Sequence, residues 1–349
     1  MKLTFRWYGD NDPVTLEKIR QIPKMSGIVS AIYNVAPGGV WDEKDILTLK
    51  EKANKNGLEF EVVESVPVPE EIKYGGKNAK TLIENYCENI RRLGKNGVKC
   101  ICYNFMPVFD WLRSELEHQN KDGSNSLAYN EQTVLSMDPL TSELSLPGWD
   151  ESYSREELKG LINKYKEIGE EGLWKNIEVF LKAVIPVAEE CGVNMAIHPD
   201  DPPWGIFGLP RIITDEKNID RFLNIVPSKN NGLTFCTGSL GASVNNDLVK
   251  MAEKYASRIH FLHLRNILIT SDREFYEVGH PTECGSIDMY GIVKALVENG
   301  FDGYVRPDHG RMIWGERGRY GYGLFDRALG ATYICGLFEG IEKTLEKKQ

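Results

Sequence analysis

The stretch NMAIHPDDPP, from Asn194 to Pro203, joins a short apolar run directly to a histidine, three prolines and two aspartates. Proline has no amide hydrogen and biases the residue before it toward an extended backbone. Pro199, Pro202 and Pro203 therefore end the run and prevent a helix from following at once. The stretch predicts a buried strand with His198 held at its tip.

On both sides of this stretch, short β-rich runs alternate with helical patterns along the chain. The eight predicted strands are LTFRWYG from Leu3, GIVSAIYNV from Gly27, LEFEVVESV from Leu58, VKCICYNF from Val98, NMAIHP from Asn194, LTFCTG from Leu233, IHFLHLRN from Ile259 and YVRPDHG from Tyr304. The runs DEKDILTLKEKANKNG from Asp42 and TLIENYCENIRRLGKNG from Thr81 carry apolar residues three or four positions apart and predict helices. Strand followed by helix, repeated in this way, predicts an α/β fold with a parallel sheet closed into a (β/α)₈ TIM barrel, because an open doubly wound sheet would use fewer units.

The alternation breaks between about residues 106 and 172, where no clear strand is visible. We interpret this segment as an insertion after the fourth strand, within a single barrel domain spanning residues 1–349. Its place in the order of elements puts it on the face where barrel enzymes carry their βα loops. It is a candidate lid or oligomer arm, and a solvated loop without a catalytic role is the alternative.

Composition narrows the classes of ligand. The chain has 349 residues, 41% hydrophobic and 27% charged, with a net charge of −9, which disfavours nucleic acid or an anionic membrane as the main partner. No apolar run approaches the roughly 20 residues of a membrane helix, and the N-terminal stretch does not resemble a signal peptide, so we expect a cytoplasmic protein. The seven cysteines are an odd number and favour free thiols over a disulfide framework.

Four side chains that can bind metal occupy the ends of the last four predicted strands. They are His198, Cys236, His263 and Asp308, each followed by turn-forming residues. Each interval is long enough for a crossover helix that returns the chain to the same end of a parallel barrel. The four tips should therefore meet at the carboxyl-terminal rim, where barrel enzymes place catalysis.

The twofold period of a strand supports this set. It places Ala196 with His198, Thr234 with Cys236, Phe261 with His263 and Arg306 with Asp308 on common faces. By the same rule His260 faces outward, and His118 lies in the insertion without a visible ligand partner. Two imidazoles, a thiolate and a carboxylate suit Zn²⁺, Fe²⁺ or Mn²⁺ better than Mg²⁺ or Ca²⁺. Such a site is structural if protein ligands fill every coordination position of the ion, and catalytic if positions stay open for substrate. Its place at the rim of the barrel favours a catalytic site.

Several blocks of the sequence, taken together and in order, resemble the mannonate dehydratase family of the xylose-isomerase-like barrel superfamily. The blocks are FRWYGDNDPV, VVESVPV, CYNFMPVFDW, IHPDDPP, LTFCTGSLG, HLRN, DMYGIVKAL and RPDHG. The resemblance implies metal-dependent dehydration of D-mannonate to 2-keto-3-deoxy-D-gluconate in hexuronate (glucuronate) breakdown, with Mn²⁺ or Fe²⁺ as cofactor. It also implies that His198, Cys236, His263 and Asp308 are the metal ligands, and that the protein is a homodimer.

Elimination of water requires a base for the C2 proton and an acid for the departing hydroxide. His309, next to Asp308, and Tyr322, between two glycines, are the candidate pair, without an assignment of which is base and which is acid. A purely supporting role is the alternative for each. Arg306, Arg6 and Tyr8 are candidates for binding the substrate, and Arg306 has the alternative of a counter-charge for Asp308.

Three other functions are compatible with such a barrel. A metal-dependent sugar isomerase would share the fold but tends toward carboxylate-rich sites, into which Cys236 fits poorly. A metallo-endonuclease would need a basic surface, which the acidic composition disfavours. A noncatalytic sugar-acid-binding or metal-binding protein would bind without turnover.

Overall fold

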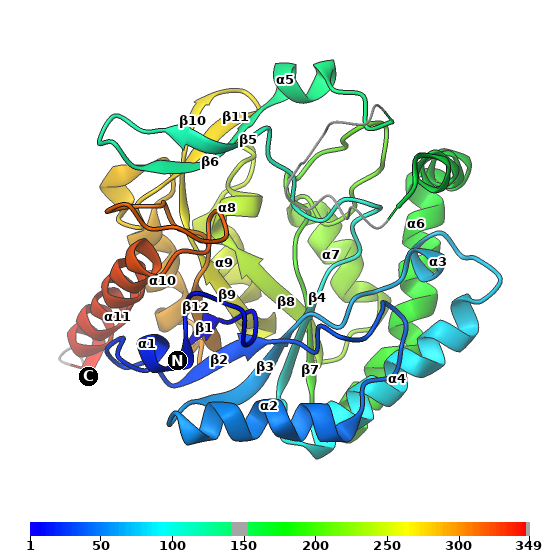
Figure 1. Cartoon of the computed structure of the whole chain (residues 1–349), viewed down its shortest axis with the longest axis horizontal. Coiled ribbons are helices and arrows are strands. Elements are labelled where there is room, and N and C mark those ends of the chain that lie inside the picture. The colour runs from blue at the N-terminus through cyan, green and yellow to red at the C-terminus, as the bar shows by residue number, and fades with distance from the viewer. Residues whose placement is uncertain (141–152, 347–349) are drawn as a thin grey trace.

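A closed barrel of eight parallel strands forms the centre of the molecule (Figure 1). The computed structural model describes residues 1–140 and 153–346. Around the barrel the strand order is β1-β12-β9-β8-β7-β4-β3-β2. The strands are β1 (Lys2–Arg6), β2 (Gly27–Ser30), β3 (Glu59–Glu64), β4 (Cys100–Tyr103), β7 (Asn194–Ile197), β8 (Asn231–Cys236), β9 (Ile259–Leu264) and β12 (Tyr304–Pro307). All eight predicted strands are present, and the predicted TIM barrel is confirmed.

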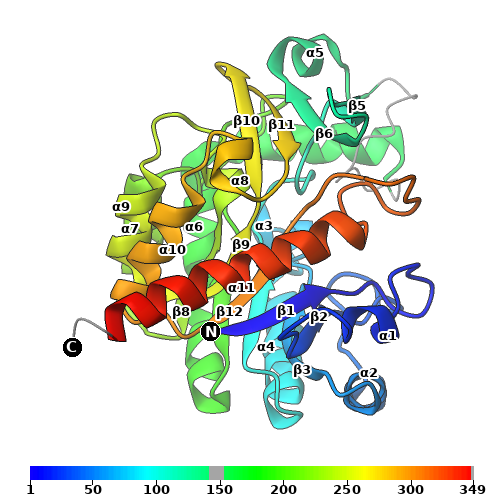
Figure 2. The same cartoon turned by 90° about the vertical axis from the view of Figure 1, so that its left-hand side faces the viewer.

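Helices surround the barrel on its outer side (Figures 1 and 2). They are α1 (Leu16–Ile19), α2 (Glu43–Lys55), α3 (Glu70–Lys73), α4 (Ala79–Lys95), α6 (Arg155–Cys191), α7 (Glu216–Ile225), α8 (Thr237–Leu240), α9 (Leu248–Tyr255), α10 (Met289–Glu298) and α11 (Phe325–Glu346), with short 3₁₀ turns at Ala256–Arg258 and Thr282–Cys284. The two helices predicted from Asp42 and Thr81 correspond to α2 and α4. The side chain of Asp42 accepts a hydrogen bond from the amide of Lys44 and so caps the first turn of α2.

The interior of the barrel holds a small apolar cluster separate from the larger core between strands and helices. Its members are Val29, Val62, Cys100, Cys102, Ala196 and Phe261. Ala196 and Phe261 are thus inward, as the strand period predicted, and the same face continues two residues later at His198 and His263. The alternation therefore directs both histidines toward the axis of the barrel at its carboxyl-terminal rim.

A second sheet of four antiparallel strands lies outside the barrel, and we call it the accessory sheet (Figure 2). Its order is β10-β11-β6-β5, with β5 (Glu115–Gln119), β6 (Asn125–Asn130), β10 (Asn266–Ser271) and β11 (Glu274–Val278). The expectation of no strand between residues 106 and 172 was wrong, because β5 and β6 lie there, followed by α5 (Glu131–Ser136). The error has a physical cause, since β6 is stabilised by pairing with β11, which is remote in sequence.

The rest of the predicted insertion divides into two parts. Residues 141–152 lie outside the described residues. After them α6 begins at Arg155, is interrupted at Gly169 (φ 59°), and continues to Cys191 directly before β7. The interruption lies close to the expected end of the insertion at residue 172, and a role as lid or oligomer arm stays a prediction.

Two simple expectations about the chain can also be compared with the structure. All seven cysteines are free thiols. Within residues 1–140 and 153–346, no helix has the length and apolar character needed to cross a lipid bilayer.

Candidate active site

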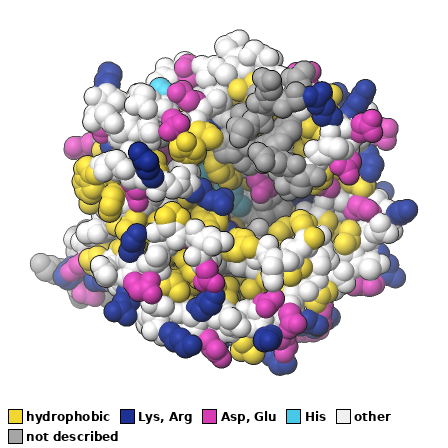
Figure 3. All heavy atoms as spheres, viewed as in Figure 1, with side chains coloured by type: hydrophobic (Ala, Val, Ile, Leu, Met, Phe, Trp, Pro, Cys, Tyr) yellow, Lys and Arg dark blue, Asp and Glu magenta, His cyan; other side chains and the backbone are white. Residues whose placement is uncertain are grey.

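A cavity of about 400 Å³ opens at the carboxyl-terminal rim of the barrel. On the face shown in Figure 3 the surface is hollowed, and basic and histidine side chains are visible in the depression. Seven of the nine residues that the sequence predicted for the site line this cavity: Arg6, Tyr8, His198, Arg306, Asp308, His309 and Tyr322. The other two, Cys236 and His263, are fully buried.

The four predicted metal ligands converge. The ligand atoms of His198, Cys236 and His263 all lie within 4.8 Å of one another. Oδ2 of Asp308 is 3.5 Å from Sγ of Cys236, and Oδ1 is 3.9 Å from Nδ1 of His263. Donors held at about 2.0–2.3 Å from one divalent ion lie about 3–4 Å apart, or up to about 4.6 Å when they are opposite each other, so the observed separations are close to those that such an ion requires.

The chemistry of these donors also fits a cation. Nδ1 of His198 lies 2.7 Å from the carbonyl oxygen of Pro199, so this nitrogen donates to the carbonyl and Nε2 is the ring nitrogen that can face Cys236 or an ion. Burial opposes positive charge on His198, yet the hydrogen bond and charge of Cys236, with help from Asp308, raise its pKa to about 9. Burial also opposes ionisation of Asp308, but the charge of Arg306 holds the pKa of that carboxyl well below its usual range. The same anionic surroundings would stabilise a divalent cation.

A second group of donors overlaps the first but does not suit an ion. Glu64, Cys102 and His263 also place ligand atoms within 4.8 Å of one another. The guanidinium of Arg306 already fills this space, with Nη2 3.1 Å from Glu64 Oε1 and Nε 3.0 Å from His263 Nε2. An ion held by this second group would have to displace the guanidinium from between Glu64 and His263. Binding of an ion through Nε2 of His263 would also require Arg306 to give up this hydrogen bond.

Arg306 contacts Asp308 as well, with Nη2 2.8 Å from Oδ1. This ion pair supports the counter-charge reading of Arg306. The side chain also lines the cavity, and its buried Nη1 has no hydrogen-bond partner in the described structure. Contact with a substrate stays a prediction.

His309 and Tyr322 meet directly, with Nε2 of His309 2.9 Å from Oη of Tyr322. A backbone hydrogen bond from Gly310 to Gly321, 2.9 Å long, holds the two segments together. The ring of Trp111 lies 5.0 Å from that of His309. Burial, followed by the nearby charges of Tyr8 and Asp308, raises the pKa of Tyr322 well above its ordinary value, so its hydroxyl stays protonated.

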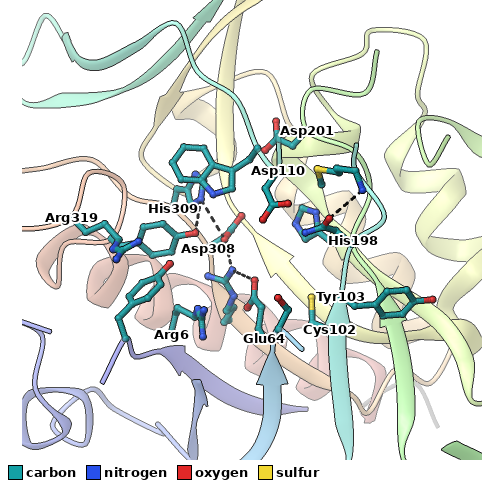
Figure 4. Close-up of a pocket in the computed structure, with 17 residues that line it drawn as sticks. Arg6, Glu64, Cys102, Tyr103, Asp110, His198, Asp201, Asp308, His309 and Arg319 are labelled. Carbon is teal, nitrogen blue, oxygen red and sulfur yellow. Dashed lines mark hydrogen bonds and ion pairs between the residues drawn. The ribbon is translucent and has the colours of Figure 1, made fainter. Parts of the chain in front are cut away.

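Arg6 and Tyr8, from the end of β1, form one side of the cavity. The guanidinium of Arg6 lies 4.5 Å from the centre of the Tyr8 ring, and that ring meets Tyr322 edge-on at 5.0 Å. The guanidinium of Arg319, which the sequence did not single out, lies 4.1 Å from the centre of the Tyr8 ring, and Arg319 also lines the cavity (Figure 4). Three cationic or hydroxyl-bearing groups thus stand together where an anionic, polyhydroxylated molecule would be bound.

Sequence reasoning missed a buried network of charges behind His309. Arg113 and Arg265 bind the carboxylates of Asp201 and Glu277, and each of the four side chains is at most 1% exposed. Asp201 and Arg265 lie within the motifs IHPDDPP and HLRN, so those motifs held a signal. Arg113 and Glu277 belong to the segment before β5 and to β11, which only the accessory sheet brings together.

Two of the three remaining histidines, His260 and His118, lie elsewhere, as expected. Nε2 of His260 is 2.8 Å from the carbonyl oxygen of Lys229, away from the barrel interior. The ring of His118 lies 4.7 Å from that of Tyr276, and Nδ1 is 3.3 Å from Glu115. Neither contributes to the cavity.

Comparison with known proteins gives a consistent result. The family model described as D-mannonate dehydratase (UxuA) matches residues 1–348. Mannonate dehydratases from Oceanobacillus iheyensis and Streptococcus uberis are 54% identical over 342 residues and 52% identical over 345 residues; the matches cover 98% of this chain in both cases and 98% and 99% of the relatives. A crystal structure of mannonate dehydratase from Streptococcus suis superimposes with a TM-score of 0.93 at 49% identity, covering 99% of this chain and 96% of that one. An L-ribulose 3-epimerase, at 12% identity and a TM-score of 0.58, shares the fold alone.

Proposed function

Because the chain belongs to the D-mannonate dehydratase family and is a hydro-lyase of that family, we propose that it converts D-mannonate to 2-keto-3-deoxy-D-gluconate in hexuronate breakdown, with Mn²⁺ or Fe²⁺ as cofactor. The observation that carries the proposal is the convergence of His198, Cys236, His263 and Asp308 beside a cavity that also holds the His309–Tyr322 pair. A donor set and a proton-transfer pair in one cavity are what a metal-dependent elimination requires.

The reaction breaks the C2–H bond and the C3–O bond of mannonate. The electron pair of the C2–H bond forms the C2–C3 double bond, the C3 hydroxyl leaves as water after taking up a proton, and the enol becomes the 2-keto acid. The proton at C2 is weakly acidic because charge accumulates beside an existing carboxylate. A divalent ion, when bound, supplies positive charge to the oxygens on which that charge accumulates.

His309 and Tyr322 are the proposed proton-transfer residues. Tyr322 keeps its proton, which suits a donor to the departing hydroxyl, and the imidazole of His309 suits an acceptor. Their hydrogen bond of 2.9 Å provides a path between the two positions. Arg6, Tyr8 and Arg306 are proposed to hold the carboxylate and hydroxyls of the substrate.

The decisive experiment is incubation of the protein, loaded with Mn²⁺ or Fe²⁺, with D-mannonate, followed by an assay for the 2-keto-3-deoxy acid. Formation of that product separates a dehydratase from an isomerase, which would yield an isomeric sugar, and from a binding protein, which would yield nothing. Absence of product with both metals would defeat the proposal. D-Gluconate, the C2 epimer, serves as the comparison substrate.

We also propose that the protein is a homodimer. An exposed apolar patch supports this assembly: Trp314 is 74% exposed, Leu329 49% and Phe325 39%. The rings of Trp314 and Phe325 lie 5.7 Å apart, so the patch is continuous. Exposed apolar patches mark contact surfaces. Light scattering of the native chain and of Trp314→Glu tests the proposal, because a dimer through this patch should become monomeric in the variant.

A further inference from the structure

Glu277, on β11 of the accessory sheet, contacts Nδ1 of His309, the ring nitrogen that does not face Tyr322. We propose that Glu277 is a positioning residue that fixes the tautomer and the orientation of His309 during dehydration. The inference rests on the proposed function, since it assigns a partner to one of its two proton-transfer residues. Glu277 lies outside the cavity lining, so it acts through His309 and not on the substrate.

The geometry identifies the bond. Oε1 of Glu277 lies 2.8 Å from Nδ1 of His309 and accepts a hydrogen bond of 3.0 Å from Nη2 of Arg113. Glu277 is 1% exposed and does not line the cavity, so water does not compete for its carboxylate. Arg113 and Arg265 both form ion pairs with Oε1 of this carboxylate. The carboxylate is therefore anionic and can only accept a hydrogen bond.

Arg265 is a second hydrogen-bond donor at Nδ1 of His309, and for this reason the carboxylate of Glu277 is needed to keep the proton on that nitrogen. Nη1 of Arg265 also lies 2.8 Å from Nδ1 of His309 and binds Oε1 of Glu277 as well. A guanidinium can only donate, so if Arg265 alone faced Nδ1, that nitrogen would have to accept and the proton would sit on Nε2. In the proposed arrangement, both Arg265 and Nδ1–H of His309 donate to Oε1 of Glu277. Glu277 therefore decides which nitrogen of His309 carries the proton.

The consequence appears at the other side of the ring. With the proton on Nδ1, the lone pair of Nε2 faces Oη of Tyr322 at 2.9 Å and the cavity beyond it. His309 is then ready to accept a proton, as the dehydration requires. In the opposite tautomer Nε2–H would be a donor, and His309 could not accept without first losing a proton.

The accessory sheet gives Glu277 a fixed position. β11 pairs with β10 and with β6, and Ile267 faces Glu277 in the register with β10. Arg113, which binds Glu277, is itself held by Asp201 through two bonds of 2.9 and 3.0 Å. The accessory sheet thus supplies the carboxylate that holds His309 at the rim of the barrel.

The test uses the full chain in two measurements. In the Mn²⁺-loaded enzyme, Glu277→Asp should lower kcat about 10- to 100-fold while KM for D-mannonate stays within about twofold, because the shorter side chain withdraws the oxygen from Nδ1. Glu277→Gln keeps an acceptor oxygen and should lose less. In the Zn²⁺-loaded, diamagnetic protein labelled with [¹⁵N]histidine, the His309 signals should show a protonated Nδ1 in the natural protein and a protonated Nε2 in Glu277→Asp. The chain has six histidines, so His309→Asn identifies the signals.

Asp201→Asn is the matched control, because it removes a carboxylate from the same two arginines without a bond to His309. It should keep the proton of His309 on Nδ1. A natural kcat in Glu277→Asp, or an unchanged His309 spectrum in that variant, would overturn the inference. The spectrum does not depend on turnover, so failure of this inference is distinguishable from a natural protein that does not dehydrate mannonate.

Discussion

The Sγ atom of Cys236 lies 3.5 Å from Oδ2 of Asp308, although 72 residues separate them along the chain. β8 and β12, which carry these residues, are not neighbours, because β9 lies between them. Their tips approach each other through the turning ends of the strands at the rim. His263, at the end of β9, completes the arrangement from the strand between them.

Removal of one of these donors should remove the metal. We expect Cys236→Ala to lose stoichiometric Mn²⁺ or Fe²⁺, measured by elemental analysis, and to lose more than about 100-fold in kcat, because the charge on the substrate would then lack its main stabilisation. Chelation of the natural protein should abolish activity, and added metal should restore it. Cys100→Ala, a buried cysteine in the barrel interior, is the control and should keep its metal. Full metal content in Cys236→Ala would show that this sulfur is not a ligand.

The hydroxyl of Tyr322 should be required for proton transfer. Tyr322→Phe is expected to lower kcat by about 10²–10⁴-fold with little change in unfolding temperature, because a positioned acid or base contributes an effect of that size. Tyr86→Phe is the control, since its hydroxyl donates to the carbonyl of Val66 at 3.2 Å away from the cavity. That variant should keep kcat. Exchange of the C2 proton with solvent, followed by NMR, reports separately on the first step, and natural turnover by Tyr322→Phe would exclude the tyrosine from the mechanism.

Arg306 should stabilise the protein most strongly when no metal is bound. Arg306→Gln leaves Asp308 and Glu64 without the guanidinium that contacts both, at a cost of about 3–5 kcal/mol in unfolding free energy. A bound divalent ion would compensate part of this loss, so denaturant unfolding with and without Mn²⁺ should give different costs. Arg221→Gln, which breaks an exposed pair with Glu171, should cost at most about 1 kcal/mol in both conditions. If Arg306→Gln lowered the unfolding free energy equally with and without metal, the counter-charge role would be contradicted. A raised KM for D-mannonate in this variant would support contact between Arg306 and the substrate.

Glu277 should make the stability of the protein sensitive to acid. Its pKa falls from an ordinary 4.5 to about 2 on folding, so its contribution is complete above about pH 4.5 and is lost as the pH falls toward about 2. The full contribution is on the order of 3 kcal/mol. Urea unfolding at a series of pH values should therefore show a shallower loss of stability on acidification in Glu277→Gln than in the natural protein. Glu51→Gln, on the exposed surface of α2, is the control, and identical slopes in all three proteins would contradict the expectation.

Gly238 should be indispensable for the position of Arg265. A β-carbon at this glycine would lie 2.6 Å from Cγ and 2.8 Å from Cδ of Arg265, which is 1% exposed and cannot move into solvent. Gly238→Ala is expected to destabilise the protein by about 1–3 kcal/mol and to lower kcat through the displaced arginine. Gly336→Ala, in an exposed part of α11 with no atom within 4 Å, should instead stabilise the helix by about 0.5–1 kcal/mol. Unchanged stability and activity in Gly238→Ala would show that the network tolerates movement.

Local patterns were sufficient to predict the barrel and the positions of its four rim residues. Each strand is a short apolar run ended by turn-forming residues, so it could be recognised without knowledge of its neighbours. The fixed period of a strand then directed His198 and His263 to the same face as Ala196 and Phe261. Parallel direction placed all four tips at one rim.

Tertiary structure alone decided the accessory sheet and the residues behind His309. β6 and β11 are short strands, each stabilised by a partner remote in sequence, and nothing in either segment specifies that partner. The contacts of Glu277 with Arg113 and His309 follow from that pairing. The sequence by itself determined which side chains reach the rim, because strand period and direction are local properties. Only the folded chain decided which charges meet behind them, because buried ion pairs form between segments whose separation in sequence carries no information about their distance in space.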